Sequence, residues 1–167
     1  LIDSVSKRYS ECGIRIGADN EEQGNPGCCH EVLPGASQSS VDSQIAAEAS
    51  LDADEDYLRD TYDEYVERRK CLIDGLNRIP GDIAIPMGAF YTVAKLPVDD
   101  SDKFCAWCLS EFEYEEEVFM APASGFYTTP GSGRNEVRIA YVLKKDDLNR
   151  ALFVLQKALE AYPGRTE

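Results

Sequence analysis

Near its start the chain reads Asp3-Ser4-Val5-Ser6-Lys7-Arg8-Tyr9-Ser10-Glu11-Cys12-Gly13-Ile14-Arg15-Ile16-Gly17. Two serines, Ser4 and Ser6, precede Lys7, and Arg15 follows eight residues later between two isoleucines. A lysine amine becomes a nucleophile when its neutral form is favoured, and it can then condense with an aldehyde. Hydroxyls, backbone N–H groups and guanidinium groups bind phosphate oxygens. The stretch therefore suits a ligand that carries both an aldehyde and a phosphate.

Pyridoxal phosphate carries both groups and is held in enzymes by a lysine Schiff base. The spacing of the lysine and the arginine does not by itself indicate pyridoxal phosphate, because the same spacing is typical of two solvated surface charges. The full string is more informative. Ser-Val-Ser-Lys followed by Gly-Ile-Arg-Ile-Gly resembles the lysine signature of class I pyridoxal-phosphate aminotransferases. Glu11 departs from that signature, because the family usually has a small or apolar residue there.

Length and composition place the chain among globular proteins. It has 167 residues, of which 43% are hydrophobic, so it can bury a sizeable core. The net charge of −14 argues against nucleic acid and anionic membranes as partners, because both require basic patches. No apolar run approaches the roughly 20 residues of a membrane span. The chain opens with Leu1 rather than Met and shows no signal peptide, so we expect a fragment or a processed product.

The six cysteines predict reduced thiols and a cytoplasmic protein, because a chain of this length does not need disulfides to fold. Cys105 and Cys108 lie in an apolar run at the i, i+3 spacing of a buried helix face. The alternative is a small zinc protein that uses Cys28, Cys29, Cys105 and Cys108. A structural zinc site normally shows a second clean cysteine pair, which this sequence lacks.

Beyond the lysine segment the hydrophobic periodicity predicts an α/β chain with a small, mostly antiparallel or mixed sheet. The helical pattern of residues 41–78 is interrupted near residues 52–55, where a break is expected. The elements expected in order are a loop over 18–40, helix over 41–78, strand and connection over 83–97, helix over 103–112, strand over 118–122, strand over 135–142 and helix over 144–161.

Arg138 is a charged residue between apolar neighbours in the expected strand 135–142. It either faces solvent or is held for a partner. Two further stretches resemble the same family: Gly88-Ala89-Phe90-Tyr91, and Met-Ala-Pro-x-x-Gly-Phe-Tyr over 120–127 followed by a glycine loop and Val-Arg-Ile-Ala-Tyr. By that resemblance Arg138 takes the substrate α-carboxylate in a bidentate pair. The alternative for Phe90 and Tyr91 is ordinary strand packing.

The resemblance is closest to aspartate aminotransferases and implies the C-terminal part of a fold type I enzyme, mainly its small α+β sandwich domain. Residues 1–40 would be a remnant of the large cofactor-binding domain, and residues 41–167 the small domain. By the same resemblance Lys7 forms the Schiff base and shuttles the α-proton, while Arg15, Ser4 and Ser6 hold the cofactor phosphate. The implied reaction moves an amino group between an amino acid such as aspartate and a 2-oxo acid.

Several functional residues of that family precede its lysine, whereas this chain begins six residues before Lys7. We therefore expect the 167 residues alone to be inactive, and a homodimer only for a complete chain. The competing hypothesis is a non-catalytic acidic interaction module, in which Lys7 and Arg15 are ordinary surface charges.

Overall fold

The computed structural model describes residues 2–19, 40–116 and 120–166. The chain divides into two compact units, Leu1–Thr61 and Tyr62–Glu167, which are described separately. The division falls inside helix α3 (Glu55–Leu76), so α3 contributes residues to both units. The proposed assignment of 1–40 and 41–167 to two enzyme domains remains a prediction. In the part of the chain that is described, no helix has both the length and the apolar character needed to span a membrane.

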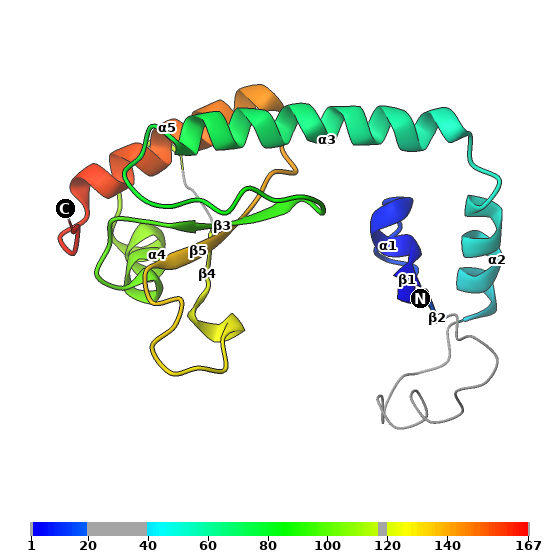
Figure 1. The fold of residues 1–167 in the computed structure, drawn as a ribbon, viewed down its shortest axis with the longest axis horizontal. Coiled ribbons are helices and arrows are strands. Elements are labelled where there is room, and N and C mark those ends of the chain that lie inside the picture. Colours follow the sequence, from blue (N-terminus) through cyan, green and yellow to red (C-terminus); the bar gives the residue numbers. More distant parts are fainter. Residues whose placement is uncertain (1, 20–39, 117–119, 167) are drawn as a thin grey trace. The chain divides into compact units, whose positions relative to one another are not determined.

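In the first unit two short strands bracket the lysine segment. Strand β1 (Ile2–Ser4) pairs antiparallel with β2 (Gly17–Asp19), so that Ser4 lies opposite Gly17. Between them α1 (Val5–Arg8) makes a single helical turn, visible at the blue end of the ribbon in Figure 1. The sequence predicted a loop from residue 18 onward, but the strand continues to Asp19, where the backbone pairs with β1. Most of that predicted loop, residues 20–39, lies outside the described residues.

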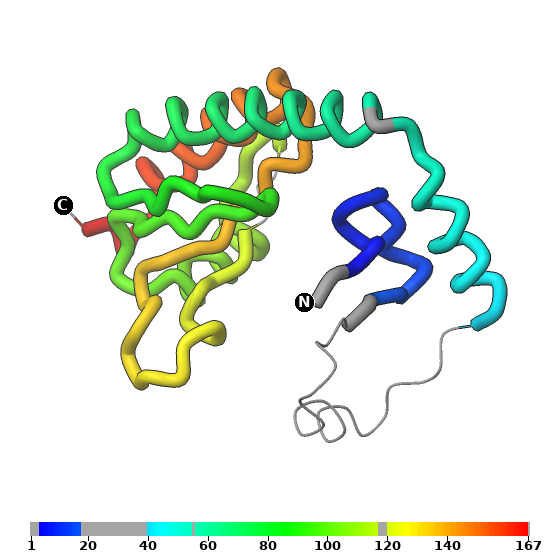
Figure 2. Tube along the Cα trace, turned by 45° about the vertical axis from the view of Figure 1, so that its right-hand side comes forward, coloured from blue at the N-terminus to red at the C-terminus, as the bar shows by residue number. Residues whose placement is uncertain are grey.

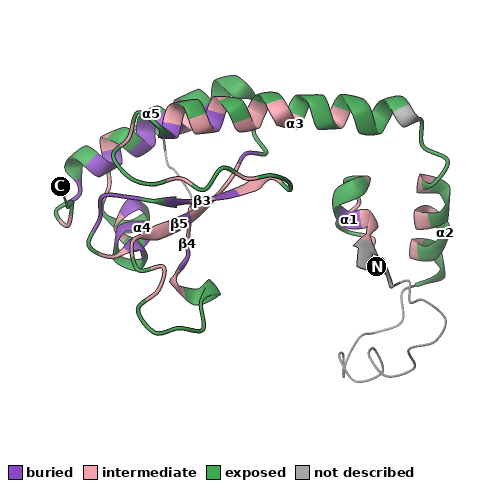
Figure 3. Cartoon of the chain, viewed as in Figure 1, coloured by how far each residue is buried: buried purple, intermediate pink, exposed green. Residues whose placement is uncertain are grey.

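Helix α2 (Val41–Ser50) follows, and the chain turns over residues 51–54 before α3 begins. Both helix starts are capped by polar side chains, since Ser40 Oγ accepts from Ser43 N at 3.2 Å and Asp54 Oδ1 accepts from Asp56 N at 3.0 Å. This confirms the predicted break. The apolar residues of this region are buried only near the C-terminal end of α3, as the colours of Figure 3 show, and α2 has no buried residue.

The second unit is built on a three-stranded antiparallel sheet in the order β3-β5-β4. Strand β5 (Glu136–Ala140) lies between β3 (Tyr91–Lys95) and β4 (Ala121–Pro122), and the tube of Figure 2 follows the connections. The remaining elements are α4 (Ser101–Ser110), the short 3-10 helix η1 (Ser124–Phe126) and α5 (Lys145–Ala161). This confirms the predicted small antiparallel sheet combined with helices.

One face of the sheet forms the core. In β3 the side chains of Thr92 and Ala94 are buried, and Val137 of β5 is fully buried beside them. Because successive strand side chains alternate between faces, Tyr91 and Arg138 lie on the opposite, half-buried face. The helices supply much of the rest of the core, with buried residues Leu72, Leu76, Phe104, Cys105, Cys108, Leu148, Leu152, Leu155, Ala158 and Leu159.

Two glycines permit close packing in this unit. A Cβ at Gly75 in α3 would lie 2.3 Å from Leu152 Cδ1 of α5, so the glycine lets the two helices approach closely. Gly81 has φ +145°, and a Cβ there would lie 2.0 Å from the carbonyl oxygen of Lys95. Gly81 is therefore required both by its backbone conformation and by the neighbouring strand.

Candidate active site

The serine residues before Lys7 shape the backbone on which the lysine stands. Ser4 caps α1, with its Oγ accepting from Ser6 N at 3.2 Å and donating to the carbonyl oxygen of Ile16 at 3.2 Å. The second bond ties the start of α1 to the residue before β2. Ser6 is buried, whereas Lys7, the next residue, is exposed. The capped turn therefore presents the lysine side chain on the surface of the first unit.

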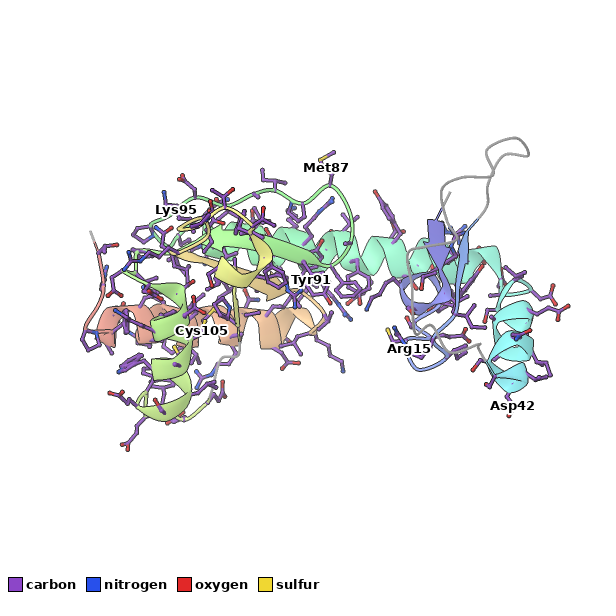
Figure 4. All side chains as sticks on the ribbon, turned by 90° about the horizontal axis from the view of Figure 1, so that it is seen from below. Arg15, Asp42, Met87, Tyr91, Lys95 and Cys105 are labelled. Carbon is purple, nitrogen blue, oxygen red and sulfur yellow. The ribbon has the colours of Figure 1, made fainter. Side chains whose placement is uncertain are left out.

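Cys12 joins the lysine and the arginine of this segment. Lys7 Nζ lies 3.5 Å from Cys12 Sγ, and Arg15 Nη1 donates to the carbonyl oxygen of Cys12 at 2.9 Å. The Cys12 thiol in turn donates to the carbonyl oxygen of Ser6 at 3.1 Å. The amine and the guanidinium thus border the same residue, and Figure 4 labels Arg15 in this turn. The sequence carries no signal for the position of Cys12, because nothing in its spacing distinguishes it from a solvated thiol.

Two residues of the turn have left-handed backbone conformations. Ser10 and Arg15 both have φ +60°, which is uncommon outside glycine and costs roughly 1–2 kcal/mol per residue. Glu11, which departs from the family signature, accepts a hydrogen bond from Ser50 Oγ at 2.8 Å. Tyr57 Oη donates to Ser10 Oγ at 3.2 Å. Contacts from α2 and α3 therefore help to hold the turn in its shape.

In the second unit Arg138 lies on the half-buried face of the sheet, close to two aromatic rings. Its guanidinium carbon lies 4.6 Å from the ring centre of Tyr91 and 4.8 Å from that of Phe126. The alternation of side chains along a strand does not by itself place Tyr91 and Arg138 on one face. Their common face follows from the β3–β5 register. The stacking on Phe126 had no sequence signal, because that residue follows β4 and approaches through the tertiary fold.

The cysteines show no metal centre in the described part of the chain. Cys12, Cys71, Cys105 and Cys108 are free thiols, and no described group of three or more His, Cys, Asp or Glu side chains is placed to hold a metal ion. Burial raises the pKa of Cys105 to about 11 and that of Cys108 to about 12, as expected for thiols packed in a helix face. Cys28 and Cys29 lie outside the described residues, so the four-cysteine zinc hypothesis is not tested.

A family model, "Aminotransferase class I and II", matches residues 1–155 of the chain. The chain belongs to this aminotransferase family. It is 28% identical to an aspartate aminotransferase of Rhizobium meliloti over 90% of its own length and 38% of the relative's. It is 28% identical to an LL-diaminopimelate aminotransferase of Maridesulfovibrio salexigens over 92% of its length and 38% of the relative's. The crystal structure of an aminotransferase from Mycobacterium tuberculosis matches with a TM-score of 0.76 and 27% identity, covering 96% of this chain and 41% of that one.

Class I and II aminotransferases depend on pyridoxal phosphate, and the described residues of this chain offer the kinds of group that bind it. The cofactor needs an amine for its aldehyde and donors for its phosphate. Lys7 and Arg15 supply an amine and a guanidinium that both reach Cys12. Ser4 Oγ already donates its proton to Ile16, so Ser4 would bind a phosphate oxygen only by exchanging that bond.

Four of the expected site residues, Ser4, Ser6, Lys7 and Arg15, lie in the first unit of the chain. Arg138 belongs to the second unit and is described there. The roles assigned to these five residues remain predictions and are developed as proposals below.

Proposed function

We propose that the protein transfers an amino group between an amino acid, aspartate in the first instance, and a 2-oxo acid. The observation that carries the proposal is the approach of Lys7 and Arg15 to the same residue, Cys12. Relatives named for aspartate and for LL-diaminopimelate support the reaction class. Aspartate is our first choice because the lysine segment resembles that of aspartate aminotransferases.

Each residue has a chemical task in this proposal. Pyridoxal phosphate, when bound, withdraws electrons from the amino-acid α-carbon. Lys7 would hold the cofactor by its aldehyde group, and its amine, when free and neutral, would take the α-proton and return it. Arg15, with Ser4 and Ser6, holds the phosphate.

Arg138 orients the amino acid by binding its α-carboxylate through two parallel N–H···O bonds. Its planar fork fixes the direction of the carboxylate as well as its position. The substrates are therefore a small amino acid and a 2-oxo acid rather than a macromolecule.

The activity is proposed for the whole protein, because this chain spans 38% of the length of the relatives reported above. We propose that the 167 residues alone do not catalyse the transfer and that the complete protein works as a homodimer. We also propose a cytoplasmic location, since the four described thiols are free and reducing compartments keep thiols in that state.

The test uses the full-length protein with pyridoxal phosphate, aspartate and 2-oxoglutarate, and follows glutamate formation. We expect saturable turnover. Lys7→Ala should abolish both this turnover and the absorbance of the Schiff base between the lysine and the cofactor. Lys144→Ala, which removes an exposed lysine of the second unit, is the control and should leave both unchanged. If Lys7→Ala keeps full turnover and a borohydride-trappable adduct, the assignment of Lys7 is wrong. If the unsubstituted protein neither binds the cofactor nor turns over, the non-catalytic acidic module becomes the better hypothesis.

A further inference from the structure

We propose that Tyr91 and Phe126 are positioning residues that hold the guanidinium of Arg138 by its faces and leave its N–H edge free for a carboxylate. The inference rests on the carboxylate-binding role proposed for Arg138 and deepens it. It is carried by the two ring contacts, at 4.6 Å and 4.8 Å from the guanidinium carbon.

The sheet register brings the ring of Tyr91 to Arg138, and η1 brings the ring of Phe126. Arg138 pairs with Val93 of β3 and with Ala121 of β4. Tyr91 lies two residues before Val93 on the same face, which places it at the diagonal position that long side chains reach. Phe126 comes from η1, shortly after β4. Strands β3 and β4 flank β5. Tyr91 lies in β3, and Phe126 lies in the segment that follows β4.

The ring of Tyr91 is itself supported by other rings. Its centre lies 4.6 Å from that of Phe90, which stacks on Tyr65 at 5.8 Å. Tyr65 makes an edge contact with Tyr141 at 6.3 Å, and Tyr141 is buried and donates to the carbonyl oxygen of Ala89 at 2.8 Å. Figure 4 labels Tyr91 beside the sheet. The ring under Arg138 is therefore fixed by a series of contacts that begins in the core.

The ring of Phe126 stands on a loop that is also anchored. Ser124 Oγ, at the start of η1, donates to Asp102 Oδ2 at 2.6 Å. Tyr127 Oη, next to Phe126, donates to the Glu136 carboxylate, which raises the pKa of Tyr127. Phe126 is exposed, so burial of its ring contributes little to stability and does not explain where the ring lies. Its contact with a cation gives a reason for its position.

Stacking determines which part of Arg138 remains available. The five N–H donors of a guanidinium lie in its plane, so rings over its faces leave those donors open at the edge. Within the described part of the second unit the guanidinium of Arg138 has no ion pair or hydrogen bond. The carboxylate of Glu136, on the same face of β5, accepts a hydrogen bond from Tyr127 and makes no ion pair with Arg138. A half-buried cation without an anion is costly, and a planar carboxylate at its edge would satisfy it.

The test measures 2-oxoglutarate binding calorimetrically in the full-length protein that carries pyridoxal phosphate, together with kcat and KM. We expect Tyr91→Leu and Phe126→Leu each to weaken binding about threefold and the double variant about tenfold, with the loss in KM rather than kcat. Tyr91→Phe and Phe126→Tyr keep a ring and should restore binding to within twofold. They also keep the proposal testable if a leucine variant fails to fold.

Phe153→Leu is the matched control, because Phe153 is an exposed ring that contacts Arg150 at 5.4 Å in α5. It should leave 2-oxoglutarate binding unchanged. A double-mutant cycle completes the test: in the Arg138→Ala background the leucine substitutions should have no further effect. If the leucine substitutions still weaken 2-oxoglutarate binding in the Arg138→Ala background, the rings do not act through Arg138.

Two failures can be separated. If Arg138→Ala itself leaves 2-oxoglutarate binding unchanged, the carboxylate role of Arg138 is wrong and the positioning role is wrong with it. If Arg138→Ala weakens binding but both leucine variants bind normally, only the positioning role of Tyr91 and Phe126 is overturned.

Discussion

The amine nitrogen of Lys7 lies 3.5 Å from the sulfur of Cys12, across the turn that follows α1. The same thiol donates to the carbonyl oxygen of Ser6, and the carbonyl oxygen of Cys12 accepts from Arg15. Cys12 thus contacts the proposed cofactor lysine and the turn before it through its side chain, and the proposed phosphate-binding arginine through its backbone carbonyl. Changes at Cys12 should therefore alter cofactor binding without touching the two cations.

Cys12→Ala removes the donor to Ser6 and the neighbour of the Lys7 amine. A hydrogen bond of this kind contributes about 0.5–1.5 kcal/mol, so pyridoxal phosphate should bind the full-length protein roughly two- to tenfold more weakly. Cys12→Ser keeps a donor at that position and should recover most of the affinity. An absorbance titration measures it, with Cys71→Ala in the second unit as the control. Equal losses for the alanine and serine variants would contradict this role.

Arg138→Lys keeps the charge but loses the planar fork. Each hydrogen bond to a charged group contributes roughly 1.5–3 kcal/mol, so amino-acid binding should weaken at least about tenfold. Cofactor binding should barely change, because the proposed phosphate ligands are other residues. Kinetic titration with aspartate provides the measurement. Arg134→Lys is the control, since Arg134 is exposed and pairs with Asp100 at 3.6 Å. Unchanged amino-acid affinity for the Arg138 variant would remove Arg138 from the site.

Gly81→Ala should destabilise the second unit by about 2–4 kcal/mol, because it combines an unfavourable backbone conformation with a clash against the Lys95 carbonyl. Gly88→Ala is the matched control, since nothing lies within 4 Å of a Cβ at that position. Thermal unfolding followed by circular dichroism compares the two variants. Equal melting temperatures would mean that the chain around Gly81 relaxes without cost.

The buried thiols of Cys105 and Cys108 should make stability decrease in alkaline solution. Burial raises their pKa values to about 11 and about 12, from an ordinary value of 9.0. The folded chain therefore retains protons that the unfolded chain releases above pH 9. Each thiol contributes stability that is fully present below that pH and is lost as the pH rises, by up to about 1.4 kcal/mol per pH unit.

Denaturant unfolding at pH 8, 9 and 10 tests this dependence. Cys108→Ala should flatten the decrease in stability between pH 9 and 10, whereas Cys71→Ala, which removes a thiol that is only partly buried, should not. The range ends at pH 10 because burial also raises the pKa of Tyr162 to about 12 and so adds a similar dependence at higher pH. An identical slope in all three proteins would show that the buried thiols do not control alkaline stability.

Local signals in the sequence predicted several elements well. The helix expected over 103–112 is α4, which begins two residues earlier because Asp100 caps it: Asp100 Oδ1 accepts from the backbone of Asp102 and Lys103. The break between α2 and α3 and the amphipathic α5 were also expected, because caps and helical periodicity depend on neighbours in the sequence. The end of the lysine segment was less predictable. A polar stretch still formed strand β2, because pairing with β1 compensates for weak local preference.

By itself, the sequence determined the chemistry of the chain: a lysine and an arginine in a recognisable aminotransferase segment, a second arginine in a strand, and the order of most helices. Only the tertiary structure decided what surrounds them. Cys12 meets Lys7 and Arg15 because Ser10 and Arg15 adopt left-handed conformations for which these residue types give no signal. Tyr91 meets Arg138 because strands distant in sequence pair in one register, and Phe126 meets it because η1 follows the neighbouring strand β4. Contacts between distant residues depend on how the whole sheet assembles, which no local pattern encodes.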